Sequence, residues 1–491
     1  MRYMDNRIML MDLYELTMAQ AWLDQGKEDL EACFEVFFRK VPEDGGYAIM
    51  GGVEDLVNFL QETKFTEENL QYLASTGLFN SRFLDYLRHM DFRCSVYAVK
   101  EGSVVFPREP LVKVVGPIIQ AQILETMILL LVNHQSLIST KASRLRLVAG
   151  KRQVLEFGAR RAQGYTAALM GARAAYIGGM DGSSCLASGE FYHVPVGGTM
   201  AHSFVQSFPT EYDAFVAYAD SFPDNTVLLV DTYNVLKSGV PNAILVEKNV
   251  LAPKGKHLKG IRIDSGDLTW LTQEARKMLD AAGLTDVKIT VSNSLDEYII
   301  RDLQMQDAKI DSYGVGERLI TARNEPVFGG VYKLTGIRKA GEKNFTPKMK
   351  ISENPEKTTN PGEKNLLRFY DLETGKAMAD LILLADEDLT PYYQGEAVEI
   401  FDPVQTWKRK TLTNYRVRNM LEPLMEKGVV VAKKYSLPEL REFCRQELET
   451  LWPTIKRFEN PQTYYVDLSA KLWQVKDEFL RSHQMLSLIH I

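Results

Sequence analysis

Between about residues 150 and 335 the sequence repeats one pattern, a short apolar run that ends in a cluster of small or polar residues. Eight such runs follow one another at intervals of about 15 to 35 residues, and helical segments separate several of them. This alternation predicts parallel strands joined by helices, which is an α/β fold with an irregular (β/α)8-type barrel. The runs are QVLEFGARR, AAYIGGMDG, YHVPVGGTMAHS, TVLLVDTYN, GIRIDSGDL, KITVSNSLD, DSYGVGERL and VFGGVYKL.

The two ends of the chain carry a different pattern, one that predicts antiparallel strands. Residues 95–117 alternate β-branched residues with Gly and Pro turns, and EACFEVFFRKVP has the composition of a strand. Strand-like runs return in LLRFYDLETGKAMADLILLADED and EAVEIFDP. We therefore expect an α+β sheet domain formed from both the N- and C-terminal parts. The predicted segments are 1–125 (sheet domain, N-terminal part), 126–340 (barrel with the active site), 341–365 (basic loop or lid), 366–430 (sheet domain, C-terminal part) and 431–491 (helical extension with a frayed tail, MLSLIHI).

Several helices are marked by residues that cap their ends. Asp12 followed by Glu15 has the spacing of a capping box, and Gly26 is suited to end that helix. Residues 121–150 predict one long helix. DLTWLTQEARKMLDAAG predicts an amphipathic helix that stops at a glycine, and SLDEYIIRDLQ predicts a helix capped by Ser294.

Composition and charge exclude several classes of protein. The net charge of −6 argues against a general nucleic-acid binder, which normally presents a basic face. The apolar stretch MILLLV is too short to span a bilayer, and the N-terminus lacks the apolar region of a secretory signal. Four scattered cysteines without a CxxC pair are typical of a reducing compartment and offer no zinc-binding spacing. We therefore expect a cytoplasmic protein without a membrane partner.

Polar and small residues stand where nearly every predicted barrel strand ends. In barrels the active site gathers at the carboxyl ends of the strands. A single cluster of this kind is explained by a helix cap or a turn, but a cluster at almost every strand favours one shared site. The residues are Glu156, Arg160, Arg161, His202, Asp231, Asp264, Asp267, Asn293, Asp296, Gly314 and Gly316.

The glycines predict a phosphate site. Gly314 and Gly316 follow a predicted strand, and glycine lets backbone N–H groups approach an oxyanion closely. Barrel phosphate sites favour the loops after the last two strands. Gly329 and Gly330 come next in the sequence, and we expect them to form the second half of that site.

Charged and aromatic residues predict the rest of the pocket. Alternation along a strand places Arg262 and Asp264 on the same face. Asp264 and Asp267 are suited to sugar hydroxyls, to Mg²⁺ or to both, although Asp267 is equally suited to cap the following helix. Phe157 beside Arg160 is suited to a planar anionic ring, because stacking and charge pairing act together. The alternative is an ordinary strand–loop junction.

Taken in order, these motifs resemble the nicotinate phosphoribosyltransferase family over roughly residues 5 to 475. The segments that carry the resemblance are DLYELTMA, EFGARRAQG, GTMAHSF, VDTYNV, GIRIDSGDL, VSNSLDE, FGGVYKL and NPEKTTNPG.

The resemblance implies a type II phosphoribosyltransferase fold and a homodimer whose active sites lie at the subunit interface. It implies that nicotinate and phosphoribosyl pyrophosphate give nicotinate mononucleotide and pyrophosphate with Mg²⁺, the entry step from nicotinate to NAD. It also implies that ATP is a co-substrate whose hydrolysis is coupled through a phosphorylated histidine.

The resemblance also implies roles for individual residues. His202 matches the phosphohistidine, and we expect Asp264 to share the catalytic work. Tyr14, Thr199 and Arg262 match nicotinate contacts, with Tyr14 reaching in from the other subunit. Phe157 and Arg160 match substrate-binding positions of the related nicotinamide enzyme. Thr359 matches a phosphoribosyl pyrophosphate contact, and we expect phosphoribosyl binding also from Asp267, Asn293, Asp296, Gly314, Gly316, Gly329 and Gly330. The Mg²⁺ ligands are left unassigned.

Other functions stay open at this point. His202 read without context is more often a core histidine than a catalyst. A nicotinamide phosphoribosyltransferase has the same fold with a different pocket. A non-catalytic barrel that binds a phosphosugar is the alternative from another class, and turnover separates it from an enzyme. The loop with Lys348, Lys350 and Lys357 is expected to close over the leaving pyrophosphate.

Overall fold

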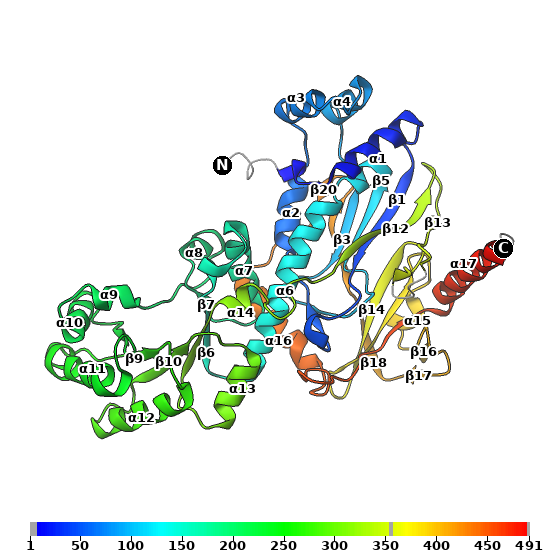
Figure 1. Ribbon diagram of the computed structural model, residues 1–491. Helices are drawn as coiled ribbons and strands as arrows, with labels where there is room; N and C mark the ends of the chain where they lie inside the picture. Colours follow the sequence, from blue (N-terminus) through cyan, green and yellow to red (C-terminus); the bar gives the residue numbers. More distant parts are fainter. Residues whose placement is uncertain (1–6, 353–356, 489–491) are drawn as a thin grey trace. The chain divides into compact units, whose positions relative to one another are not determined.

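The computed structural model describes residues 7–352 and 357–488, and the chain divides into two compact units (Figure 1). The first unit comprises Met1–Leu137 and Val327–Ile491, and the second comprises Ile138–Pro326. The predicted barrel segment, 126–340, thus extends beyond the second unit at both ends. The reason at its C-terminal end is that β12 (Val331–Arg338) pairs with β1 (Glu31–Phe37), a strand of the first unit.

A seven-stranded sheet organises the first unit and combines both ends of the chain, as predicted. β1 lies between β5 and β12 and pairs with both in antiparallel fashion, and six of its seven residues are buried. In Figure 1 the blue and cyan N-terminal strands lie beside the yellow-green β12. The order is β13 (Thr346–Pro347), β12, β1, β5 (Val112–Pro117), β3 (Ser95–Val99), β19 (Leu421–Glu426) and β20 (Val429–Val430).

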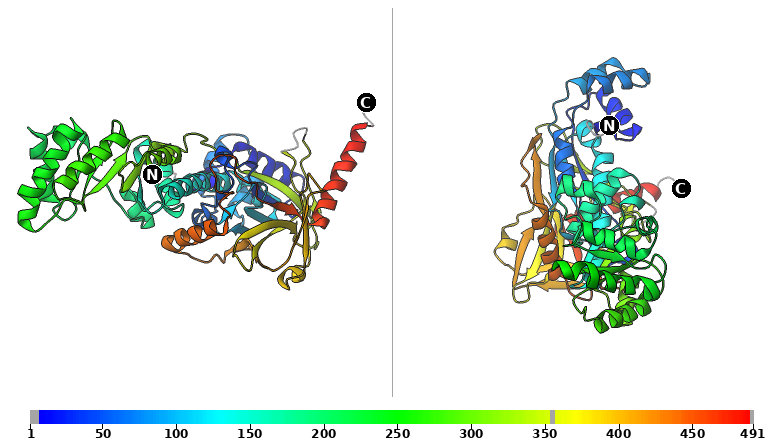
Figure 2. Two further views of the ribbon diagram at one scale, coloured as in Figure 1. Left: turned by 90° about the horizontal axis from the view of Figure 1, so that it is seen from below. Right: turned by 90° about the vertical axis from the view of Figure 1, so that its left-hand side faces the viewer.

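Smaller sheets and several helices complete the first unit. The C-terminal helix α17 (Ala470–Leu488), red in Figure 2, includes part of the predicted frayed tail, and residues 489–491 lie outside the described residues. A four-stranded sheet has the order β18 (Tyr415–Asn419), β14 (Lys364–Asp371), β15 (Ala377–Leu384) and β21 (Val466–Leu468). Among the described residues, two sheets have two strands each. One pairs β16 (Val398–Phe401) with β17 (Arg409–Leu412), and the other pairs β2 (Ala48–Ile49) with β4 (Val104–Val105). The helices are α1 (Leu13–Asp24), α2 (Val53–Gln61), α3 (Glu67–Ser75), α4 (Ser81–Arg88), α5 (Ile118–Gln122), α15 (Thr390–Tyr393) and α16 (Leu437–Thr450).

The second unit contains one sheet of six parallel strands. Its order is β7 (Gly182–Ser183), β6 (Gln153–Glu156), β11 (Ser312–Val315), β10 (Lys288–Ser292), β9 (Gly260–Ile263) and β8 (Val227–Leu229). Within the described residues no pairing joins β7 to β8, so closure into a barrel is not confirmed. The helices are α7 (Tyr165–Ile177), α8 (Leu186–Tyr192), α9 (His202–Gln206), α10 (Glu211–Ser221), α11 (Val240–Val246), α12 (Leu268–Ala281), α13 (Glu297–Met305) and α14 (Glu317–Ile320).

Three of the eight predicted barrel strands are wrong as assigned. AAYI ends the helix α7, and the two-residue strand β7 follows it. In the YHVPVGG segment Tyr192 ends α8, and the following residues are irregular apart from one bridge between Ser183 and Val196. VYKL starts β12, which pairs antiparallel with β1. In each case a short apolar run is compatible with either a helix or a strand, and the segments that pack or pair with it determine which one forms.

The two faces of the six-stranded sheet differ in chemistry, and this difference positions the site. Ile261 and Ile263 on β9 are fully buried in an apolar core that helices α10, α11 and α12 share. In Figure 1 helix α12 runs along one side of the sheet. Arg262, between the two isoleucines, is only partly buried on the opposite face. Since successive side chains alternate, one face is apolar and packed and the other carries polar groups.

One long helix, α6 (Glu125–Ala149), links the two units, as predicted. The helical stretch Ile118–Ala149 has the length and composition of a membrane span, and it is the one such stretch among the described residues. In its most apolar window 67% is buried inside the structure, which is typical of a core helix.

The predicted caps are confirmed with one correction. Asp12 and Glu15 form the capping box of α1, and Gly26 follows that helix with a φ of 64°. Helix α13 is capped by Asp296 instead of Ser294, because the Asp296 carboxylate accepts hydrogen bonds from the N–H groups of Tyr298 and Ile299.

Candidate active site

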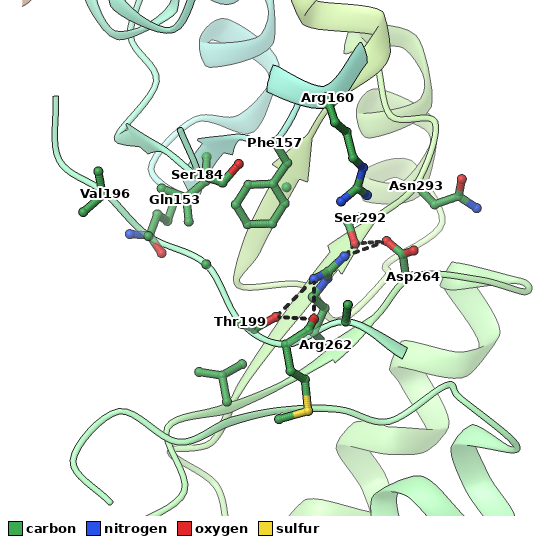
Figure 3. A pocket seen from close by; sticks show the side chains of 18 of the residues that line it. Gln153, Phe157, Arg160, Ser184, Val196, Thr199, Arg262, Asp264, Ser292 and Asn293 are labelled. Atoms are coloured by element: carbon green, nitrogen blue, oxygen red, sulfur yellow. Dashed lines mark hydrogen bonds and ion pairs between the residues drawn. The ribbon is translucent and has the colours of Figure 1, made fainter. Parts of the chain in front are cut away.

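A cavity of about 1030 Å³ opens on the polar face of the six-stranded sheet (Figure 3). It reaches the carboxyl ends of β6, β9, β10 and β11, where the sequence predicted a shared site. Its lining includes Phe157, Arg160, Arg161, Thr199, Arg262, Asp264, Asn293, Gly314 and Gly316 from the predicted set, and Leu155, Ser184, Gly198, Ser292 and Ser294 besides.

Arg262 lies at the centre of a hydrogen-bonded cluster on this face. Its Nη1 donates to Thr199 Oγ1 at 3.1 Å and to the Met200 carbonyl at 3.4 Å. Its Nη2 donates to Asp264 Oδ1 at 3.1 Å, and its Nε donates to Ser292 Oγ at 2.9 Å. The shared face of Arg262 and Asp264, expected from strand alternation, is confirmed by this ion pair. These hydrogen bonds fix the orientation of the guanidinium plane.

Phe157 provides an apolar surface beside this cation. The Arg262 guanidinium carbon lies 5.5 Å from the centre of the Phe157 ring. Behind the ring, the buried Glu156 carboxylate accepts hydrogen bonds from the Gly158 N–H and, at 2.6 Å, from Ser183 Oγ. Burial raises the pKa of Glu156. Glu156 thus fastens the loop that carries Phe157 and does not line the cavity.

His202 lies at the first residue of α9, with its side chain 41% exposed. Its Nδ1 is 3.1 Å from Thr232 Oγ1. Its Nε2 lies 3.9 Å from Asp231 Oδ1 and 4.0 Å from Asp264 Oδ2. One ring nitrogen is therefore held by a hydroxyl, while the other faces two carboxylates.

Asp231 connects the histidine to the cavity. Its side chain is 1% exposed, and its Oδ2 accepts hydrogen bonds from the Asp264 N–H at 3.0 Å and from Ser265 Oγ at 2.7 Å. Its Oδ1, the atom that faces His202, is buried without a hydrogen bond among the described residues. An unpaired buried carboxylate oxygen is costly, so this atom is suited to a proton or a cation from a substrate complex.

The loop after β10 adopts an unusual backbone conformation. Asn293 has a φ of 90° and Ser294 a φ of 52°, and both line the cavity. Left-handed backbone at two successive residues other than glycine costs about 1–3 kcal/mol each and is concentrated at functional sites. Asn293 thus lies where the sequence predicted a ligand contact.

Two predicted ligand residues serve as helix caps. Asp267 accepts a hydrogen bond from the Trp270 N–H at 3.0 Å at the start of α12. Asp296 caps α13 and forms an ion pair with Arg318. Neither residue lines the cavity, because a cap side chain bends back toward its own helix.

Four predicted site residues, Tyr14, Gly329, Gly330 and Thr359, belong to the first unit. Tyr14 on α1 is 44% exposed, and burial together with Glu125 raises its pKa. Gly330 packs on α6, since a Cβ atom there would lie 2.2 Å from Asn133 Oδ1, whereas Gly329 has open space and a φ of 73°. Thr359 is buried, and its Oγ1 accepts a hydrogen bond from the Lys350 N–H at 3.2 Å.

Sequence reasoning did not include Thr232 and Ser292, which the structure places in the site, and it gave Asp231 a place only among the polar residues at strand ends. Asp231, Thr232 and Ser292 follow or end the apolar cores of TVLLVDTYN and KITVSNSLD. The position after each strand was a usable sign, but the contacts with His202 and Arg262 join residues about 30 positions apart and need the folded sheet.

The described residues contain no group of three or more His, Cys, Asp or Glu that is arranged to hold a metal ion. Asp231 Oδ1 nevertheless has no hydrogen-bond partner in the part of the chain that the structure describes, and both this atom and Asp264 Oδ2 lie near His202 Nε2. Mg²⁺ is commonly held by one or two carboxylates while water and substrate phosphates complete its coordination. These two oxygens therefore fit a magnesium ion that arrives with a phosphorylated substrate.

Comparisons with known proteins agree with this geometry. Family models match the nicotinate phosphoribosyltransferase N-terminal domain at residues 9–133, the nicotinate phosphoribosyltransferase family at 152–378 and the C-terminal domain at 363–476. Nicotinate phosphoribosyltransferase of Bacillus subtilis (strain 168) is 41% identical over 480 residues, which cover 97% of this chain and 96% of that protein. The human enzyme of the same name is 35% identical over 95% of each chain.

A solved structure is similar over the same extent. A crystal structure of human nicotinic acid phosphoribosyltransferase has a TM-score of 0.84 and 33% identity to this chain, and the match covers 95% of this chain and 99% of that one. The match thus includes both units and the strands that bear the site. The chain belongs to the nicotinate phosphoribosyltransferase family.

Proposed function

We propose that this chain joins nicotinate to the ribosyl carbon of phosphoribosyl pyrophosphate, giving nicotinate mononucleotide and pyrophosphate, with hydrolysis of ATP coupled to the transfer. The observation that carries the proposal is the arrangement of His202 between Thr232, Asp231 and Asp264, next to the Arg262–Phe157 surface. The family supports the same reaction.

The nicotinate subsite lies at Phe157 and Arg262. A planar aromatic carboxylate stacks favourably on the Phe157 ring while arginine side chains compensate its charge. Arg160 lines the same cavity and has no ion-pair or hydrogen-bond partner within residues 7–352 and 357–488. Arg160 thus supplies a positive charge that the protein itself does not neutralise, for the carboxylate or for a phosphate.

The ATP step uses His202 Nε2 as the nucleophile. In the reactive tautomer, Nδ1–H donates a hydrogen bond to Thr232 Oγ1 and Nε2 carries the lone pair. This lone pair attacks the γ-phosphorus of ATP, the bond from that phosphorus to the ADP oxygen breaks, and ADP leaves. Water later cleaves the N–P bond, giving phosphate. The Thr232 hydroxyl is compatible with this tautomer, since a hydroxyl oxygen can accept a hydrogen bond from Nδ1–H.

The glycosyl step depends on positioning. The bond from the ribosyl carbon to pyrophosphate breaks toward an oxocarbenium-like centre, and the nicotinate nitrogen must lie in line with it. The Arg262 cluster holds Asp264 toward the cavity, where its carboxylate is suited to ribose hydroxyls. Mg²⁺ bound by Asp231 and Asp264 would neutralise phosphate charge beside His202.

We also propose that the protein is a homodimer, that its second unit is an irregular barrel and that it is cytoplasmic. Tyr14, Leu10 and Leu13 expose apolar surface on and before α1, which supports a homodimer in which Tyr14 completes the partner's nicotinate site. The six parallel strands carry the site at their carboxyl edge as barrel strands do, which supports an irregular barrel. We place the enzyme in the cytoplasm, because its four cysteines are unpaired.

One assay tests the function. Purified protein with phosphoribosyl pyrophosphate and Mg²⁺ receives nicotinate or nicotinamide, each with and without ATP, and mononucleotide formation is followed. The expected result is product from nicotinate, increased by ATP. Product mainly from nicotinamide would assign the pocket to the amide. Binding of the phosphosugar without turnover of either base would identify a non-catalytic binding protein.

A further inference from the structure

Ser292 ends β10, and its hydroxyl lies between two charged groups of the site. The residue is 3% exposed. Its Oγ accepts a hydrogen bond from Arg262 Nε at 2.9 Å and donates a short one to Asp264 Oδ1. Figure 3 shows this hydroxyl between the two side chains. A hydroxyl can accept from a guanidinium and donate to a carboxylate at the same time, which no apolar side chain can do.

The Ser292 hydroxyl determines which N–H donors of Arg262 stay available to a ligand. Arginine has five N–H donors. Nε is used by Ser292, the two on Nη1 by Thr199 and Met200, and one on Nη2 by Asp264. One Nη2 donor therefore has no partner among the described residues. The guanidinium plane is set, and a single directed N–H remains for a ligand.

Ser292 also keeps the Arg262–Asp264 pair from closing on itself. Arginine and a carboxylate prefer two parallel hydrogen bonds, through Nε and Nη2. Here Nε is occupied by Ser292, so Asp264 contacts Nη2 only. Without the hydroxyl, Asp264 can rotate to take both donors. Its Oδ2 would then turn from His202 toward Arg262, and the remaining Nη2 donor would change direction.

The fold places the serine at this point by strand register. Thr290 of β10 pairs with Arg262 of β9, and Ser292 lies two residues further on the same face. Ser292 also pairs with Gly314 of β11, which has no side chain to cover the hydroxyl. The position is therefore defined by backbone pairing on both sides.

We propose that Ser292 is the positioning residue that orients Arg262 toward the aromatic carboxylate substrate and Asp264 toward the ribosyl donor. The inference rests on the proposed function. Removal of the hydroxyl weakens nicotinate binding, because the guanidinium closes onto Asp264. Since Asp264 turns toward Arg262 at the same time, the contacts that this carboxylate offers to the ribosyl donor and to His202 weaken as well.

The test compares Ser292→Ala, Ser292→Thr and a matched control, Ser139→Ala. Ser139 is a fully buried serine of the second unit outside the cavity, and its hydroxyl donates to the Ala174 carbonyl at 2.9 Å. For each protein the KM values for nicotinate and phosphoribosyl pyrophosphate, the phosphohistidine yield from labelled ATP and the thermal midpoint are measured. Calorimetric titration with nicotinate measures its affinity without turnover.

Ser292→Ala is expected to raise the KM and the Kd for nicotinate by about tenfold or more, and to raise the KM for phosphoribosyl pyrophosphate as well, because Asp264 leaves its position. Ser292→Thr is expected to restore most of the affinity, and Ser139→Ala to lower only the thermal midpoint. An unchanged nicotinate KM in Ser292→Ala overturns the inference, as does equal impairment of Ala and Thr variants. A wild-type protein that binds nicotinate without turnover contradicts the proposed function instead.

Discussion

The ring of Phe157 occupies the space that a Cβ atom on Gly314 would need. Two ring carbons, Cδ2 and Cε2, lie 2.5 Å from the ideal Cβ position. Gly314 is buried within β11, and Phe157 follows β6, the strand paired with β11. The absence of a side chain at residue 314 therefore allows the aromatic surface to lie against the sheet, under the Arg262 guanidinium.

Gly314→Ala is expected to displace the Phe157 ring. Overpacking of this kind costs about 1–3 kcal/mol in stability, and the displaced ring raises the KM for nicotinate. Chemical unfolding and steady-state kinetics measure the two effects. A double-mutant cycle with Phe157→Ala supplies the control, because Gly314→Ala loses most of its stability cost where the ring is absent. Additive effects in the cycle would show that the clash with the ring is not the cause.

His202→Ala is expected to abolish the stimulation of product formation by ATP. In the proposed function the imidazole is the nucleophile for the γ-phosphoryl group, so labelled ATP should no longer transfer phosphate to the protein. His257→Ala is the matched control, since that side chain is 72% exposed and its Nδ1 pairs with Glu247 at 2.9 Å, outside the cavity. Retention of the protein label in the His202 variant would assign phosphorylation to another residue.

Glu15 makes the stability of the first unit depend on pH. Burial raises its pKa from 4.5 to about 7, against the opposing effect of its hydrogen bond from Thr126. Between these two pH values the folded chain binds more protons than the unfolded chain, so this group's contribution to stability decreases as pH rises. The decrease is complete above about pH 7 and amounts to at most ~3 kcal/mol.

Glu15→Gln is expected to remove that dependence. The difference in unfolding free energy between variant and wild type should shift in favour of the variant from pH 4.5 to pH 7, as measured by urea unfolding across the range. Glu399→Gln, at a side chain 55% exposed, serves as the control. A constant difference between Glu15→Gln and wild type over the whole range would contradict the assignment.

Chelation of divalent cations is expected to stop mononucleotide formation while the thermal midpoint stays the same. We propose that Mg²⁺ arrives with the phosphorylated substrates, and the described residues hold no preformed group of three metal ligands. Product assays and thermal unfolding with and without a chelator, followed by added Mg²⁺, measure both effects. A large drop in the midpoint on chelation would instead point to a resident structural metal.

The sequence alone determined the parts that depend on local chemistry. The capping box at Asp12 and Glu15 and the shared face of Arg262 and Asp264 are confirmed, because each depends on residues at most three positions apart. The edge where Phe157, Arg262 and Asn293 meet was also predictable, since carboxyl ends of neighbouring parallel strands lie together.

Only the tertiary structure decided which runs became strands of which sheet and which polar residues line the cavity. Val331 pairs with Phe37, nearly three hundred positions away, so β12 belongs to the same sheet as β1. Asp264 and Asp267 are equally polar, yet one reaches Arg262 and the other caps α12. Ser292 acquires its role from a neighbouring strand. Long-range pairing chooses among conformations that short segments leave nearly equal in energy, and for that reason these features need the folded chain.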